Sequence, residues 1–260
     1  MLLSNAISSH QQGKLIHNET DQQGLIQIRQ WQQLRWLHLD DNNIQACINL
    51  DSPATLTIAY LEAMVTALLF KANPQNLLNL GCGGASFERF FSRYLPTLAI
   101  SSVDINATII RLARQFFQLP PQHPVIHRPA EELLHHCNQT FDLIFCDLHH
   151  GVDHPGSINS KLFHADAYRC LNYDGVYVLN LLPQHEPQML DWLLALRQSF
   201  NHVILLPITG RQNIVVLALK QPPASQDQLI RQAIPWQRLT GINFEALAKR
   251  LILLPNKPKS

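Results

Sequence analysis

The sequence has few charged residues and no long apolar run. Charged side chains make up 15% of the 260 residues, and the formal net charge is +1. Neither a nucleic acid nor an anionic membrane is therefore expected as a partner. No stretch is long enough to span a bilayer, and the first residues lack the cationic segment of a secretory signal. We expect a cytoplasmic protein.

The cysteines form no C-x-x-C pair, and their odd number and irregular spacing argue against a disulfide framework. They are instead expected to be reduced and mostly buried; they are Cys47, Cys82, Cys137, Cys146 and Cys170. Apolar residues make up 46% of the chain. That share and the length allow one large domain, alone or with a small appendage, and no internal repeat is visible.

A glycine-rich turn follows the buried segment 77–80. Gly81, Gly83 and Gly84 let the backbone turn tightly and approach a ligand, because they carry no Cβ. A helix predicted from about Ser86 would present free backbone N–H groups to that ligand. The turn therefore indicates a binding site.

An acid stands at the distance expected for a nucleoside site. Asp104 follows the next predicted strand, 98–103, about twenty residues after the turn, where a carboxylate can bind ribose hydroxyls. A dinucleotide site would need G-x-G-x-x-G, but Ser86 stands where the third glycine would be. A glycine-rich first turn also occurs in other α/β domains. The combination of turn and acid favours an adenosine-containing cofactor.

Helices and strands alternate after residue 50. A helix is expected over 51–70, with Ser52 as its N-cap, and it is followed by the cofactor strand. Seven predicted strands alternate with helices and end near Leu219, which indicates an α/β fold with a Rossmann-like, doubly wound, mostly parallel sheet. One of these strands, 141–147, ends in Asp147.

Both ends of the chain differ from this central part. Residues 1–23 are polar and rich in glutamine, so they are expected to begin poorly ordered. Three alternating segments then predict a small antiparallel sheet, over 25–29, 34–39 and 44–48. After residue 220 we expect a linker and an amphipathic helix that contains Phe244, Leu247 and Leu251. The predicted divisions are 1–57, 58–220 and 221–260.

The order of these pieces resembles the spermidine synthases, above all their bacterial spermidine synthase-like relatives, and the central domain resembles class I S-adenosylmethionine-dependent methyltransferase folds. The resemblance covers about Leu25 to Leu219 and rests on motifs in the sheet, the following helix and the cofactor domain: Leu37-His38-Leu39-Asp40, Tyr60-Leu61-Glu62-Ala63-Met64, Gly81-Cys82-Gly83-Gly84, Val103-Asp104-Ile105, Ala113-Arg114-Gln115-Phe116-Phe117 and Phe141-Asp142-Leu143-Ile144-Phe145-Cys146-Asp147. It implies transfer of an aminopropyl group from decarboxylated S-adenosylmethionine to a polyamine, usually in dimers or tetramers.

The resemblance also implies roles for individual residues. Asp147 matches the catalytic acid of the family, and Tyr60 and Gln45 match positions that touch substrate or cofactor. The cofactor set further includes the three loop glycines, Asp104 and Ile105. Each residue also has a purely structural interpretation. Asp147 could cap a loop, Tyr60 could be a core residue, and Gln45 could be an ordinary strand residue.

Three positions depart from the family pattern. Gly84 stands where the family has an acid in the glycine loop, and Pro129 replaces an acid near the adenine, with Glu131 two residues further on. His150 replaces a second acid that helps to bind the cationic amine. A histidine there is neutral or positive, so the polyamine substrate is in more doubt than the cofactor.

Two further patterns occur in the chain. A histidine-rich segment comprises His149, His150, Asp153, His154 and His164. Its spacing matches no helical zinc motif, so a polar loop is expected and no metal. Asn180-Leu181-Leu182-Pro183 weakly resembles an amino-methyltransferase motif, but it follows the fifth strand and lacks the aromatic residue.

The leading hypothesis is an aminopropyltransferase-like enzyme that uses an S-adenosylmethionine derivative and an amine, possibly as a homodimer. A methyltransferase acting on a small molecule is the enzymatic alternative, because the fold serves both chemistries. A nucleoside-binding or interaction protein that lost the acids is the non-enzymatic one.

Overall fold

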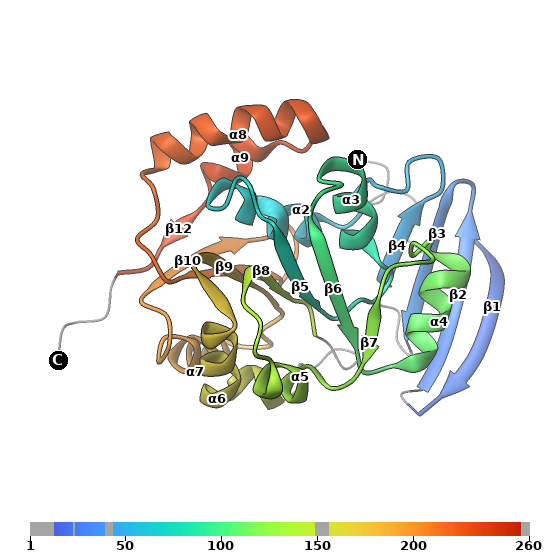
Figure 1. Cartoon of the computed structure of the whole chain (residues 1–260). Coiled ribbons are helices and arrows are strands. Elements are labelled where there is room, and N and C mark those ends of the chain that lie inside the picture. The colour runs from blue at the N-terminus through green and yellow to red at the C-terminus, as the bar shows by residue number, and fades with distance from the viewer. Residues whose placement is uncertain (1–12, 23, 40–43, 149–155, 256–260) are drawn as a thin grey trace.

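The computed structural model describes residues 13–22, 24–39, 44–148 and 156–255. In this part of the chain a small N-terminal sheet stands beside a larger sheet with helices on both faces (Figure 1). The predicted Rossmann-like fold with a separate antiparallel sheet is therefore confirmed. No helix in the described ranges is long and apolar enough to cross a membrane.

The N-terminal sheet has four strands in the order β1-β2-β3-β4, all antiparallel neighbours. They are β1 (Lys14–Asp21), β2 (Gly24–Trp31), β3 (Leu34–Leu39) and β4 (Ile44–Asn49). One face buries Ile26, Ile28 and Ile48 against helix α4 (Ala107–Phe116), which lies over the sheet in Figure 1. The small sheet is thus fixed to the main domain by an apolar interface.

The start of the chain, which was expected to be poorly ordered, lies outside the described residues. Strand β1 is a fourth strand where three were predicted from residue 25 on. Its sequence is polar and only partly buried. It is ordered by a ladder to β2, in which Lys14 lies opposite Gln30 and Asp21 opposite Gly24. Pairing with a neighbour determines such a strand more than its own propensity does.

The main sheet has the order β12-β10-β11-β9-β8-β5-β6-β7. Its strands are β5 (Asn76–Leu80), β6 (Ala99–Asp104), β7 (Val125–His127), β8 (Phe141–Cys146), β9 (Leu171–Leu181), β10 (His202–Pro207), β11 (Ile214–Leu219) and β12 (Ile252–Leu253). The run from β9 to β7 is parallel, and the pairs β9–β11, β11–β10 and β10–β12 are antiparallel.

The described part of this sheet has eight strands where seven were expected. The additional strand, β12, pairs Leu253 with Ile204 at the edge of the sheet. It lies in the tail, where a helix through Leu251 was predicted. The helix α9 (Phe244–Ala248) ends before Leu251, and a longer helix, α8 (Gln226–Thr240), precedes it. The helical spacing of the apolar residues gave no sign that the segment after α9 would add a strand to the edge of the sheet.

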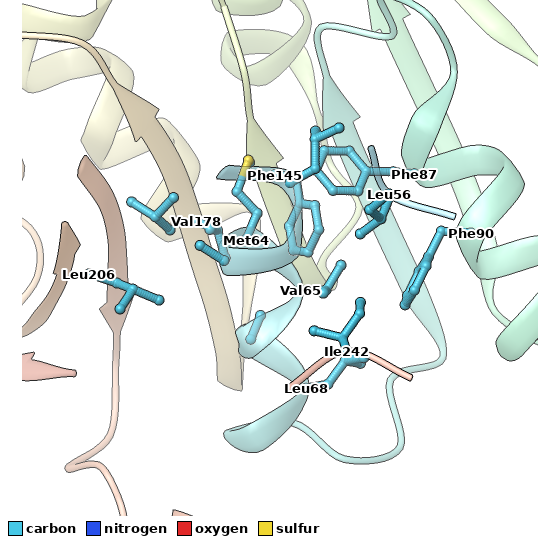
Figure 2. Close-up of a cluster of buried hydrophobic side chains, with 14 of the residues drawn as sticks. Leu56, Met64, Val65, Leu68, Phe87, Phe90, Phe145, Val178, Leu206 and Ile242 are labelled. Carbon is cyan, nitrogen blue, oxygen red and sulfur yellow. The ribbon is translucent and has the colours of Figure 1, made fainter. Parts of the chain in front are cut away.

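Helices cover both faces of the main sheet. On one side lie α2 (Ala59–Met64), the short η1 (Val65–Leu69), α3 (Ser86–Tyr94), α8 and α9; on the other lie α5 (Ala130–His136), η2 (Gly156–Asn159), α6 (Lys161–Arg169) and α7 (Glu186–Leu196). Figure 2 shows the first core, where Met64 and Val65 pack with Phe145 and Val178 of the sheet. This core also includes Trp36 of β3 and Phe244 of α9. It therefore crosses the predicted divisions at residues 57 and 220, which stay predictions.

The helix expected over 51–70 begins later than predicted. Ser52 is not its N-cap: α2 starts at Ala59, and Ile58 precedes it without a side-chain cap. The Arg89 Nε donates to the carbonyl of Pro53 at 2.7 Å, and the same buried guanidinium binds the carbonyls of Gly84 and Phe117. The Pro53 carbonyl is thus used to satisfy a buried cation from α3 instead of a first helical turn.

Candidate active site

The glycine turn lies where β5 meets the end of β8. Gly81 has a φ of +95° and Gly83 a φ of +47°, in the region that favours glycine. A Cβ on Gly81 would overlap the backbone oxygen of Asp147. The chain therefore needs a glycine at 81 because the residue after β8 approaches the turn so closely.

Asp104 holds this turn in place. Its Oδ2 accepts a hydrogen bond from the Gly83 N–H at 3.0 Å, and its Oδ1 accepts one from the Asn106 N–H at 2.9 Å. Loss of hydration raises the pKa of Asp104, and these backbone hydrogen bonds oppose the rise. The carboxylate thus connects the end of β6 to the glycine turn and also lines the pocket beside it.

Gly84 is buried beneath the N-terminal sheet. A Cβ at this position would overlap the Cβ of Ala46 in β4. Its backbone is not in the positive-φ region, unlike that of Gly81 and Gly83. Packing of β4 on the turn therefore leaves no room at residue 84 for the acidic side chain that the resemblance implied there.

We expect Gly84→Asp to lower the free energy of unfolding by about 1–3 kcal/mol, since it overpacks the contact with Ala46. Ala46→Gly in the same chain should recover most of that loss, because it removes the obstructing methyl group. Urea unfolding of the parent, of Gly84→Asp and of the double variant measures both effects. A Gly84→Asp chain as stable as the parent would mean that β4 does not press on the turn.

Tyr60 and Asp147 form a pair in the pocket beside the glycine turn. The Tyr60 hydroxyl at the start of α2 donates a hydrogen bond to the Asp147 carboxylate. Burial raises the pKa of Tyr60 well above its ordinary value, the negative charge of Asp147 and this hydrogen bond raise it further, and Arg211 opposes the rise. Tyr60 therefore stays protonated and available as a donor. The Asp147 N–H donates to the Leu80 carbonyl at 2.9 Å, which fixes its backbone to β5.

One pocket brings together the described candidate residues. It is lined by Gln45, Tyr60, Gly81, Gly83, Gly84, Asp104, Ile105 and Asp147. Their convergence from five regions of the chain agrees with a common site, and their individual roles stay predictions. His150 lies outside the described residues.

Sequence reasoning missed most of the apolar lining. Leu37, Ala46 and Ile58 come from the N-terminal sheet and the segment before α2, and Phe87 comes from α3. Leu37 and Ala46 were expected in strands and Ile58 and Phe87 in helices, but nothing indicated a ligand beside them, because a protein core and an apolar pocket select the same residue types. Pro129 and Glu131, singled out as departures from the family pattern, also line the pocket.

Comparison with known proteins identifies the family. Over 232 residues the chain is 30% identical to the polyamine aminopropyltransferase of Chromobacterium violaceum, covering 87% of this chain and 88% of the relative. The chain belongs to the polyamine aminopropyltransferase family. This confirms the resemblance to spermidine synthases and makes the protein a transferase of that family. A model described as a methyltransferase domain matches residues 77–175.

Solved structures agree with the fold of a polyamine aminopropyltransferase. A probable spermidine synthase from Corynebacterium glutamicum matches with a TM-score of 0.72 and 18% identity, over 94% of this chain and 91% of that one. A spermidine synthase in complex with the transition state analogue AdoDATO matches with a TM-score of 0.69 and 16% identity, over 93% and 85% of the two chains. Both superpose across the small sheet and the main sheet, given these coverages.

The histidine-rich segment of this aminopropyltransferase is described only in part. His149, His150, Asp153 and His154 lie outside the described residues, within which no three histidine, cysteine or acidic side chains are placed to hold a metal ion. His164 is 1% exposed, and its Nε2–H donates to the Ile158 carbonyl at 2.9 Å. It is a core residue of α6 and does not reach the pocket lining.

His164 should make stability depend on pH. Burial lowers its pKa from 6.5 to about 4. The unfolded chain therefore takes up a proton below pH 6.5 that the native chain refuses until about pH 4, so stability falls as the pH drops through this window. The loss attributable to His164 should reach about 3 kcal/mol. Urea unfolding across the window should show a flatter pH dependence for His164→Leu than for the parent. The exposed His136→Leu should keep the parent's slope; equal slopes for all three would contradict the assignment.

Proposed function

We propose that this protein moves the aminopropyl group of decarboxylated S-adenosylmethionine to a small amine. The observation that carries the proposal is the Tyr60–Asp147 pair, which lies in one pocket with the glycine turn and Asp104. A donor site and a base for the acceptor are therefore adjacent. The family membership of the chain supports the same reaction.

The donor would lie along the glycine turn. We assign to Asp104 the binding of ribose hydroxyls, through acceptor positions that the backbone hydrogen bonds from Gly83, Asn106 and Cys82 do not use. A Cβ on Gly83 would stand in open space, so we assign the close approach of the nucleoside to this glycine, while Gly81 and Gly84 shape the turn against Asp147 and Ala46. Ile105 offers an exposed apolar side chain beside the nucleoside. Gln45 supplies an amide from the N-terminal sheet. These roles are part of the proposal.

The transfer needs little beyond placement and a base. The sulfonium is already a good leaving group, so the protein must deliver a neutral amine in line with the carbon under attack. As the new C–N bond forms, the C–S bond breaks and its electron pair goes to sulfur, which leaves methylthioadenosine. The proton lost by the amine passes to Asp147, directly or through one water. Tyr60 orients that carboxylate through its hydrogen bond.

The acceptor is proposed to be less cationic than the long polyamines. The described lining contains the acids Asp104, Glu131 and Asp147, but it also contains Arg128. Gly84 leaves no acid in the turn, and His150 replaces one in the sequence. Each additional ammonium group therefore has fewer carboxylates to pair with than in the family pattern.

Methyl transfer is the second candidate function. The methyltransferase-domain model matches residues 77–175, which contain the turn, Asp104 and Asp147. Because the fold supports both chemistries, the choice depends on which donor binds. A nucleoside-binding protein without turnover would keep the same pocket.

The remaining partner assignments belong to the same proposal. We infer a cytoplasmic enzyme that acts on small molecules without a nucleic acid, as a homodimer. The described cysteines are free, and Cys47, Cys82, Cys146 and Cys170 are buried, in keeping with a reducing compartment.

Calorimetric titration of the protein separates the candidates. We expect decarboxylated S-adenosylmethionine and methylthioadenosine to bind more tightly than S-adenosylmethionine. A preference for S-adenosylmethionine would favour methyl transfer. Failure of all three to bind would contradict the pocket assignment itself.

A further inference from the structure

Two buried side-chain amides stand in line behind Asp147. Asn180, near the end of β9, donates from Nδ2 to the Asp147 Oδ1 at 2.9 Å. Asn213, just before β11, donates from Nδ2 to the Asn180 Oδ1 at 3.0 Å. Asn180 is 1% exposed and Asn213 9% exposed. A hydrogen-bonded row therefore runs from Asn213 through Asn180 to the carboxylate, which Tyr60 contacts as well.

The direction of this row is fixed by the carboxylate at its end. An ionised carboxylate can only accept hydrogen bonds, so Asn180 must turn its NH₂ group to Asp147. Its oxygen then faces Asn213, which must donate. Reversing either amide would bring two acceptors or two donors together in a buried place. The row is thus consistent with an ionised Asp147 and favours that form.

Rigid elements hold the row. Asn180 lies opposite Val215 in the β9–β11 ladder, so the strand bearing Asn180 is paired with the strand that Asn213 precedes. The Asn213 carbonyl accepts from the Ile208 N–H at 2.9 Å, which closes the turn between β10 and β11. Side chains on paired strands are oriented more exactly than those on free loops.

We propose that Asn180 and Asn213 are positioning residues of the transfer reaction. They keep the Asp147 carboxylate ionised and fix its orientation toward Tyr60 and the amine. The inference rests on the proposed function, in which Asp147 takes the amine's proton. Neither asparagine lines the donor pocket, so both act through Asp147.

Other charged and titratable groups surround Asp147 and must stay constant in a test. Tyr60 faces it from α2, Cys146 precedes it on β8, and the charge of Arg211 reaches Tyr60 from the β10–β11 turn. The same pocket also contains Asp104, Arg128 and Glu131. A change at Asn213 leaves all of these in place.

The test is Asn213→Asp, which keeps the shape of the side chain and reverses the direction of the hydrogen bonds along the row. The new carboxylate only accepts, so Asn180 must turn its NH₂ toward residue 213 and its oxygen toward Asp147. We expect the acid limb of the kcat profile to move up by about one pH unit. We also expect kcat at neutral pH to fall about tenfold, with the donor KM nearly unchanged. Asn243→Asp adds the same charge at the exposed N-cap of α9 and should change neither quantity.

A second readout needs no turnover. Carbon-13 NMR can follow the aspartate carboxyls, with the Asp147 signal assigned through Asp147→Asn. Its titration midpoint should rise by about one pH unit in Asn213→Asp. If Asn213→Asp fails to fold, Asn213→Ala removes the second donor and should shift the midpoint in the same direction by less.

The outcomes separate the two proposals. If the parent transfers no aminopropyl group but the midpoint moves, the proposed function fails and the electrostatic role of the row stands. If the parent is active but the midpoint and the pH profile of the variants equal those of the parent, the asparagines merely satisfy one another and the inference is overturned.

Discussion

Replacing Asp147 by Asn is expected to lower kcat roughly 10²–10⁴-fold, with donor affinity nearly unchanged. The substitution keeps the shape of the side chain and removes the only group of the Tyr60–Asp147 pair that can take up a proton. Asn180 can still donate to the Oδ1 of the new residue, and Tyr60 can accept from its NH₂ group. Steady-state kinetics with the accepted amine, together with calorimetry of the donor, measures both quantities.

The matched control is Asp174→Asn, the same chemical change at an exposed position paired with Lys71. It should leave kcat unchanged. If the Asp147→Asn variant turned over as fast as this control, Asp147 would have only a structural role. Asn180 and Asn213 would then have no part in catalysis through it.

Replacing Asp104 by Ala is expected to weaken donor binding by tens of fold or more. Each charge-assisted hydrogen bond contributes roughly 1.5–3 kcal/mol, and the variant loses the bonds proposed to the ribose. It also frees the Gly83 N–H, so the turn itself is less well held. Calorimetric titration with methylthioadenosine measures the loss.

Asp227→Ala, in the exposed first turn of α8, removes one carboxylate far from the pocket and should bind normally. Equal affinity of the Asp104→Ala chain and this control would show that the nucleoside does not lie against β6.

The convergence of the turn, Asp104 and Asp147 was predictable because all three follow parallel strands. The carboxyl ends of β5, β6 and β8 meet at one edge of the sheet, and the periodicity of the sequence identified each of these strands. The positions of Tyr60 and Gln45 in the pocket could not be predicted in this way. Their inclusion depended on resemblance to the family, because no pattern shows how the small sheet packs on the turn.

Other features depend on pairing between distant segments and could not be read from local sequence. Strand β1 is polar and forms by pairing with β2, and β12 forms by pairing with β10. Pro53 suggested a helix start, but its carbonyl binds Arg89 of α3. In the sequence, Asn180 stands out only as part of a segment that weakly resembles an amino-methyltransferase motif. Its contact with Asn213 joins residues 33 positions apart in the chain, which no short motif records.

The most direct test of the central claim is a transfer assay read by mass spectrometry. The protein is incubated with decarboxylated S-adenosylmethionine and a set of small amines, and S-adenosylmethionine replaces the donor in a parallel reaction. We expect one amine to gain a single aminopropyl group while an equal amount of methylthioadenosine forms, and the Asp147→Asn chain to be nearly inactive. Methylated product and S-adenosylhomocysteine in the parallel reaction, with no aminopropyl product, would contradict the account.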